Sequence, residues 1–194
     1  MLARLYSQWP CLIAAAQVLA VCGVLSGSLA YQFRLGELPC PLCVLQRFSF
    51  LLACAGPLGI LRNGALPGGG IAGQARGFAL CIFASFIGAA VSIRQILLHI
   101  VPPDSGYGPP VFGLHLYTWA LVVFFCLILS SALGLLGLSD QALALPRVIT
   151  NGIGALIIAI GAAIAFATFA MQGFNTFLPA DPQSYELFSQ LGFR

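Results

Sequence analysis

Two cysteines and an arginine at the start of a long apolar stretch are the residues best suited to chemistry in this chain (residues 38–47, LPCPLCVLQR). Cys40 and Cys43 are separated by two residues, a spacing that brings the sulfurs close enough for a disulfide or a shared metal in a first helical turn. Pro41 predicts a helix N-terminus here, and the partial positive charge of that terminus favours a thiolate. Arg47 follows Cys43 by one helical turn, and a charge inside an apolar stretch needs an anionic or polar partner. These features predict a reactive thiol pair, with Cys40, Cys43 and Arg47 as catalytic residues.

The composition places this stretch in a membrane. The chain has 194 residues, of which 60% are hydrophobic and 7% charged, and its mean hydropathy is +0.99. These values exclude an ordinary soluble domain, and the small net charge of +3 gives no case for nucleic-acid binding. We predict an all-α integral membrane protein, a single domain over residues 1–194 with about five transmembrane helices. The expected spans are about 11–30, 42–61, 77–100, 116–138 and 148–171.

Arginines in the short connections between the spans predict the orientation. Those on one side of the predicted spans are Arg4, Arg62, Arg76 and Arg147. The amino terminus is therefore expected in the cytoplasm of a bacterium. The cysteine pair and the tail 172–194 are expected to face the periplasm from the inner membrane, where disulfides persist. The first span is expected to remain as an anchor, although Ser28-Leu29-Ala30 resembles a signal-peptide cleavage site.

Further polar residues are expected near the same outer surface. Arg94 and Gln95 stand near the end of the third span and His99 closes it, so together with Arg47 they are candidates to bind a ligand in one polar pocket. Alternatively, each arginine extends to the lipid headgroups. A metal or haem held between His99 and His115 is a further alternative, although interfacial histidines usually need no ligand.

Small and polar residues elsewhere predict packing and a last short helix. Gly23 and Gly27 in the first span have the spacing that lets a neighbouring helix approach closely. Asp181 and Pro182 are typical of a helix N-cap and first residue, which predicts a short interfacial C-terminal helix on the outer membrane surface. The remaining cysteines lie inside the spans and are interpreted as packing residues: Cys11, Cys22, Cys54, Cys81 and Cys126.

The pattern resembles the DsbB family of quinone-linked membrane disulfide oxidases. The resemblance covers about residues 10–135 and rests on the two cysteines that open the second span, on Arg47 and on Arg94-Gln95. It implies a DsbB-like four-helix core plus one further span. It also implies that electrons pass from a periplasmic thioredoxin-like thiol protein through the Cys40–Cys43 pair to ubiquinone or menaquinone. In that scheme Cys40 exchanges with thiols, while Cys43 and Arg47 lie beside the quinone.

Two features depart from that family. The family usually has four spans and carries a second cysteine pair in its second outer loop, whereas the corresponding loop 101–113 contains no cysteine. Either a partner attacks the Cys40–Cys43 disulfide directly, or another membrane subunit supplies the missing pair, or the fold serves a different use. The alternative function is a non-enzymatic membrane subunit or a metal-binding module, in which the two cysteines brace the loop or hold copper(I). Two sulfurs alone make a poor zinc site.

Overall fold

The computed structural model describes residues 2–62, 70–103, 106–139 and 146–192, with side chains from residue 8 onward. Within these residues the chain forms helices and no strands, and five helices are long and apolar enough to cross a membrane. The predicted all-α architecture with five spans is therefore confirmed. The helices are α1 (Leu2–Leu35), α2 (Pro41–Leu61), α3 (Gly70–Leu98), α4 (Leu116–Leu136), α5 (Arg147–Gln172) and α6 (Glu186–Gln190).

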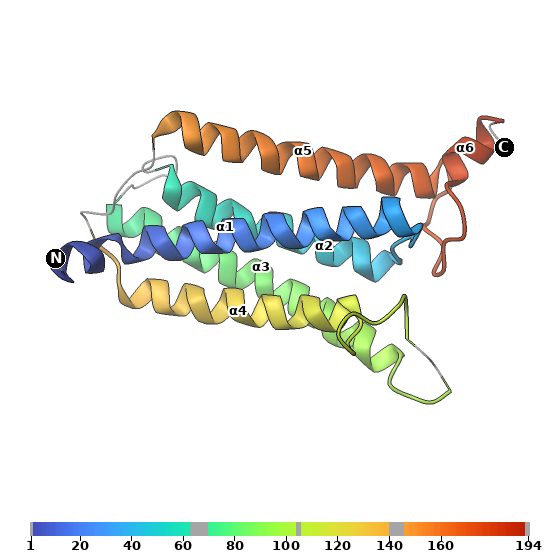
Figure 1. Cartoon of the computed structure of the whole chain (residues 1–194), viewed down its shortest axis with the longest axis horizontal. Coiled ribbons are helices and arrows are strands. Elements are labelled where there is room, and N and C mark those ends of the chain that lie inside the picture. The colour runs from blue at the N-terminus through green and yellow to red at the C-terminus, as the bar shows by residue number, and fades with distance from the viewer. Residues whose placement is uncertain (1, 63–69, 104–105, 140–145, 193–194) are drawn as a thin grey trace.

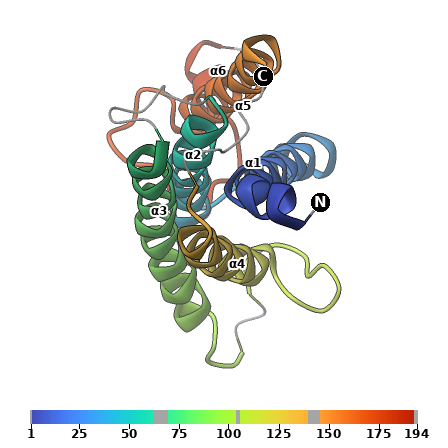
Figure 2. The same ribbon diagram turned by 90° about the vertical axis from the view of Figure 1, so that its left-hand side faces the viewer.

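The first four long helices form a bundle, and the fifth lies beside it. In the bundle α2 packs against α1 and α3, while α4 packs against α3 and α1 and closes the ring (Figure 2). α5 lies along the outside of α2 and α1, and α6 follows at its far end (Figure 1). The core between the helices is apolar, with the rings of Phe50 and Phe124 stacked 3.9 Å apart.

α2 and α3 approach each other closely at two glycines. A Cβ on Gly56 would lie 2.0 Å from the carbonyl oxygen of Gly77, so any side chain at residue 56 would force the two helices apart. This contact keeps α2, which carries both the cysteine pair and Arg47 near its start, against α3, which carries Gln95.

Two helices are longer than the apolar stretches from which they were predicted. α1 continues to Leu35 instead of ending at residue 30, and α3 begins at Gly70 instead of residue 77. Hydropathy marks only the length that suits hydrocarbon, whereas helical hydrogen bonds continue into the more polar ends. α1 stops where Gly36 adopts a left-handed conformation (φ 71°), which is a common way for a helix to end.

The predicted start of the last helix is wrong. α6 begins at Glu186 and not near Asp181, because the Asp181 carboxylate accepts a hydrogen bond from the side chain of Gln183 (2.7 Å) instead of capping a helix. Pro182 is buried outside any helix. The five-residue helix places Leu187 in a buried position, so it anchors the tail against the rest of the molecule.

The cysteines outside the pair mostly pack as predicted. Cys11, Cys54 and Cys81 are buried and Cys22 packs against the core, but Cys126 is exposed on the outside of α4. The side chain of Arg4, residues 104–105 of the outer loop and the last two residues of the tail lie outside the described residues.

Candidate functional site

The cysteine pair begins α2 in the predicted way. Cys40 is the N-cap residue and Pro41 the first helical residue. The backbone N–H of Cys43 donates a hydrogen bond to the Cys40 sulfur (3.3 Å), and the two sulfurs lie 2.9 Å apart as free thiols. Cys40 is only 5% exposed, whereas Cys43 is half-buried.

Cys40 does not share the expected preference for a thiolate. Its hydrogen bond with Cys43 and its burial raise the pKa of the Cys40 thiol above the ordinary value. The backbone N–H groups of Leu42 and Cys43 lower that pKa, as the helix N-terminus predicts, but by less than the first two effects raise it. Cys40 is therefore the member of the pair that holds a proton.

Gln95 reaches both sulfurs from α3. Its amide nitrogen donates to the Cys40 sulfur (3.2 Å) and the Cys43 sulfur (3.3 Å), and its amide oxygen accepts a hydrogen bond from Gln46 (2.9 Å). Gln95 is fully buried. The Gln46 bond fixes the amide so that its donors face the sulfurs, where they stabilise negative charge.

Arg47 is buried on α2 and is held by neutral groups. Its guanidinium donates to the side-chain oxygen of Gln32 (2.6 Å) and to the backbone carbonyl of Ser28 (3.1 Å), both on α1. Within the described residues no acidic side chain pairs with it. Further N–H donors of the guanidinium remain for a ligand, and a buried cation with neutral partners favours an anion beside it.

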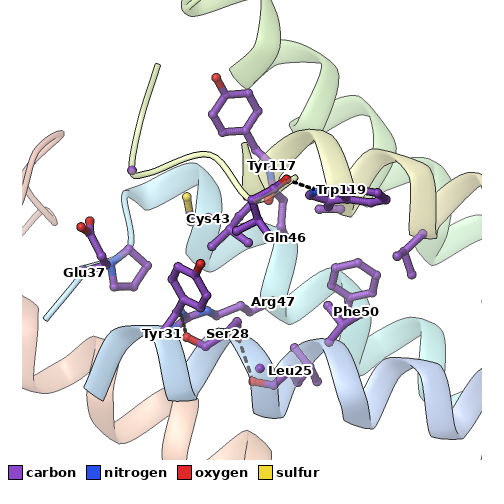
Figure 3. A pocket seen from close by; sticks show the side chains of 18 of the residues that line it. Leu25, Ser28, Tyr31, Glu37, Cys43, Gln46, Arg47, Phe50, Tyr117 and Trp119 are labelled. Atoms are coloured by element: carbon purple, nitrogen blue, oxygen red, sulfur yellow. Dashed lines mark hydrogen bonds between the residues drawn. The ribbon is translucent and has the colours of Figure 1, made fainter. Parts of the chain in front are cut away.

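A cavity of about 310 Å³ lies between α1, α2 and α4. Cys43, Gln46 and Arg47 border it from α2, and Trp119 borders it from α4 (Figure 3). Most of its walls are apolar. Gly23 and Gly27 also border it, and a Cβ on either would meet nothing within 4 Å. These glycines therefore leave open space instead of receiving a neighbouring helix as expected.

The described part of the loop between α3 and α4 forms one wall of the cavity. Tyr107 borders the cavity and donates a hydrogen bond from its hydroxyl to the Leu38 carbonyl (2.5 Å), two residues before Cys40. Burial raises the pKa of the Tyr107 phenol, so this hydrogen bond persists throughout the physiological pH range. The loop is thereby fastened to the segment that carries the cysteine pair.

Three of the four predicted ligand-binding residues do not border the cavity: Arg94, His99 and Gln95, which is buried at the sulfurs instead. Arg94 is exposed, and the His99 ring stacks against Tyr117 at 5.8 Å; neither borders the cavity. Arg94 precedes Gln95, and successive helical side chains diverge by about 100°. The turn that buries Gln95 therefore points Arg94 outward. His115 stacks on the same tyrosine at 5.2 Å, and no group of three or more metal-binding side chains occurs in the described part of the chain.

Gln32 is the site residue that the sequence reasoning missed. It is 1% exposed and accepts the hydrogen bond from Arg47. A signal was present, because a glutamine within an apolar stretch is costly unless it has polar partners. Its partner could not be named from the sequence, since Arg47 stands fifteen residues further along on another helix.

A comparison with known protein families identifies the family to which the chain belongs. The sequence profile described as "Disulfide bond formation protein DsbB" matches residues 10–107, about half of the chain. The chain belongs to the DsbB family. The matched part includes α2 with the cysteine pair and all of α3, and the five apolar helices make this DsbB family member a multi-pass membrane protein.

Individual DsbB relatives support the assignment. "Disulfide bond formation protein B" of Chromobacterium violaceum is 40% identical over 89 residues, which is 45% of this chain and 51% of the relative. "Disulfide bond formation protein B 1" of Pseudomonas fluorescens is 30% identical over 139 residues, or 57% of this chain and 80% of the relative. The chain thus spans about half the length of the first of these curated relatives and most of the second. No solved structure matches the chain significantly.

Proposed function

We propose that this protein is a quinone-dependent thiol:disulfide oxidoreductase. Electrons pass from the thiols of a periplasmic thioredoxin-like protein through the Cys40–Cys43 pair to ubiquinone or menaquinone in the membrane. The amino terminus lies in the cytoplasm, and the cysteine pair and tail face the periplasm of a bacterial inner membrane. The names of the relatives, which describe disulfide bond formation, support the thiol chemistry.

The observation that carries the proposal is that Cys43 and Arg47 border one apolar cavity. A quinone head group is flat and largely apolar, with two carbonyl oxygens that accept hydrogen bonds. The cavity volume of about 310 Å³ lies within the range of small-molecule sites. Apolar walls suit the ring, and the Arg47 guanidinium is a charged donor suited to a carbonyl oxygen. When bound, the quinone would accept two electrons and two protons.

The chain's own residues carry the thiol exchange. A partner thiolate attacks the Cys40 sulfur of the Cys40–Cys43 disulfide, which forms a mixed disulfide and releases Cys43 as a thiolate. The second thiol of the partner then displaces Cys40, so the partner leaves oxidised and both cysteines are reduced. Gln95 and Arg47 stabilise the negative charge at Cys43, and Cys40 takes up a proton. Two electrons and the Cys40 proton then leave the pair as its disulfide reforms, and the second proton that a quinone would take up comes from water.

Since the loop 101–113 has no cysteine, we propose that the partner attacks this disulfide directly. Because Cys40 is 5% exposed, the segment fastened by Tyr107 has to move before a partner reaches the sulfur. We therefore propose that Cys40 is the sulfur that exchanges with the partner. The hydrogen bond between Tyr107 and Leu38 keeps this sulfur covered until the segment moves.

Arg47→Ala tests the cavity assignment. Purified protein is mixed with a short-chain ubiquinone or menaquinone analogue and a reduced thioredoxin-like protein, and quinone reduction is followed by absorbance. We expect kcat/KM for quinone to fall at least about tenfold, because a hydrogen bond from a charged donor contributes roughly 1.5–3 kcal/mol. Arg47→Lys should restore only part of the rate, since an ammonium lacks the planar guanidinium fork.

Arg94→Ala is the matched comparison, since it removes an exposed arginine at the same end of the bundle. We expect it to leave quinone reduction near the wild-type rate. Wild-type quinone reduction by Arg47→Ala would disprove the cavity assignment. Stoichiometric bound metal without quinone turnover would instead favour a metal-binding module.

A further inference from the structure

The fifth helix and the tail contact Gln32, the side chain that accepts a hydrogen bond from Arg47. Gln32 accepts the hydrogen bond from Arg47 with its oxygen, and its nitrogen donates to the hydroxyl oxygen of Tyr185 (3.2 Å) and to the sulfur of Met171 (3.4 Å). Met171 lies near the end of α5, and Tyr185 is the N-cap of α6. Figure 1 shows α6 at the end of the bundle where α1 passes into α2. Neither α5 nor the tail borders the cavity, so their contact with the site is indirect.

The two ends of the Gln32 amide are not interchangeable in its contacts with Arg47 and Tyr185. A glutamine side chain has one acceptor end and one donor end. Arg47 carries only donors, so Gln32 binds it only when the amide oxygen points toward the guanidinium. With its oxygen on Arg47, the amide points its N–H groups away from the guanidinium, and the groups that accept those N–H bonds anchor the side chain in that position. A thioether sulfur is a weak acceptor, so the Tyr185 oxygen is the stronger of the two partners.

The surroundings keep the Tyr185 hydroxyl in place. Leu187, two residues after Tyr185, is buried, and the side-chain oxygen of Gln190 accepts a hydrogen bond from the backbone N–H of Phe174 (2.8 Å). These contacts hold α6 against the end of α5. Gln32 is 1% exposed, so within this packing water has little access to replace the tyrosine oxygen.

We propose that Tyr185 is a positioning residue for the reaction, acting through Gln32 on Arg47. Its hydroxyl oxygen orients the Gln32 amide, and the amide holds the guanidinium toward the cavity that Cys43 borders. The inference rests on the proposed function, because the ligand that Arg47 receives is taken to be a quinone. The part of the chain beyond the four-helix bundle is thereby given a role in the chemistry.

The test measures quinone binding without turnover. The chain has two tryptophans, and Trp119 borders the cavity, so in a Trp9→Phe background the remaining fluorescence reports on occupancy of the cavity. Titration with a short-chain ubiquinone quenches this fluorescence and yields a Kd. We expect Tyr185→Phe, which keeps the ring and removes only the hydroxyl, to raise Kd about three- to tenfold, as loss of one hydrogen bond implies.

Gln183→Ala is the matched control, since it removes an exposed tail hydrogen bond, to the Asp181 carboxylate, that involves neither Gln32 nor the contacts that hold α6. We expect its Kd to equal that of the parent protein. Gln32→Glu provides a second variant, because its carboxylate pairs with Arg47 and has no donor for Tyr185. Its Kd should rise about tenfold or more.

A double variant that combines Tyr185→Phe with Arg47→Ala distinguishes an effect of Tyr185 on the position of Arg47 from a general effect on packing. If Tyr185 acts through Arg47, Tyr185→Phe has no further effect on Kd in the Arg47→Ala background. The inference is overturned if Tyr185→Phe binds quinone like the parent, if Gln183→Ala weakens binding equally, or if the Tyr185 and Arg47 effects add. Failure of the proposed function looks different: the parent protein then shows no saturable quenching, or Arg47→Ala leaves Kd unchanged.

Discussion

Cys40 and Cys43 lie in one helical turn but in different surroundings. Cys40 is the buried N-cap, and Cys43 borders the cavity at a half-buried position. Gln95 donates a hydrogen bond to both sulfurs, so it does not account for the difference between the two thiols. The asymmetry comes instead from burial and from the hydrogen bond between the thiols, which together leave the proton on Cys40.

This asymmetry predicts the pH dependence of Cys40 alkylation. Only the thiolate reacts, and an ordinary cysteine ionises near pH 8.5. Because the pKa of Cys40 is raised, the folded, reduced protein keeps the neutral thiol above that pH. Iodoacetamide should therefore modify Cys40 slowly at about pH 8.5 and faster only at higher pH.

The measurement is quenched alkylation over a pH series with quantification of the Cys40 peptide by mass spectrometry. The same protein unfolded in detergent is the control, and its Cys40 should titrate near the ordinary value. A midpoint for folded Cys40 at or below the unfolded value would contradict the assignment of the proton to Cys40.

At the scale of elements, the site depends on the close crossing of α2 and α3. The sulfurs belong to the start of α2 and Gln95 to α3, so the distance between the helix axes sets the hydrogen bonds at the pair. Gly56 and Gly77 set that distance further along the same two helices. A substitution at the crossing should therefore lower the stability of the fold, and it should alter the hydrogen bonds at the cysteine pair only as a consequence of helix displacement.

Gly56→Ala should destabilise the protein. Its Cβ would lie 2.0 Å from the Gly77 carbonyl oxygen, and overpacking of this kind costs roughly 1–3 kcal/mol. We expect a lower midpoint of thermal unfolding in detergent, followed by intrinsic fluorescence. Gly152→Ala is the control, because a Cβ there meets nothing within 4 Å. Equal midpoints for the two variants would show that the helices separate without cost.

At the scale of the whole molecule, the two ends of the bundle differ in character. The start of α2, which carries the cysteine pair, the loop between α3 and α4, and α6 lie at one end (Figure 1). Arg62 and the start of α5 at Arg147 lie at the other, where Arg62 donates a hydrogen bond to the Asn151 side chain (3.0 Å). Arginine in short connections favours the cytoplasm, so the end with the cysteine pair is expected outside.

Labelling of intact cells tests this orientation. In a background with Cys40 and Cys43 replaced by serine, a new cysteine at the exposed Phe177 should react with a membrane-impermeant maleimide. A new cysteine at the exposed Pro146, at the opposite end, should react only after the cells are lysed. The reverse pattern would place the cysteine pair in the cytoplasm and remove the oxidising compartment from the proposal.

The sequence by itself determined the membrane architecture and the thiol pair. Apolar stretches of sufficient length have to form helices in lipid, because the backbone must satisfy its own hydrogen bonds. The Cys40-Pro-Leu-Cys43 spacing brings the sulfurs together within one turn, whatever the rest of the chain does. Hydropathy did not determine helix ends, since α1 and α3 extend beyond their apolar stretches.

The tertiary structure alone decided which polar side chains meet. Arg94 and Gln95 are neighbours in sequence, yet the packing of α3 buries Gln95 at the sulfurs and leaves Arg94 exposed. Gln32 meets Tyr185 across 153 positions of the chain, a contact that no local pattern records. Periodicity specifies which residues share a helix face, but helix rotation and partner helices follow from packing of the whole bundle, and these place Arg47 between the cavity and Gln32.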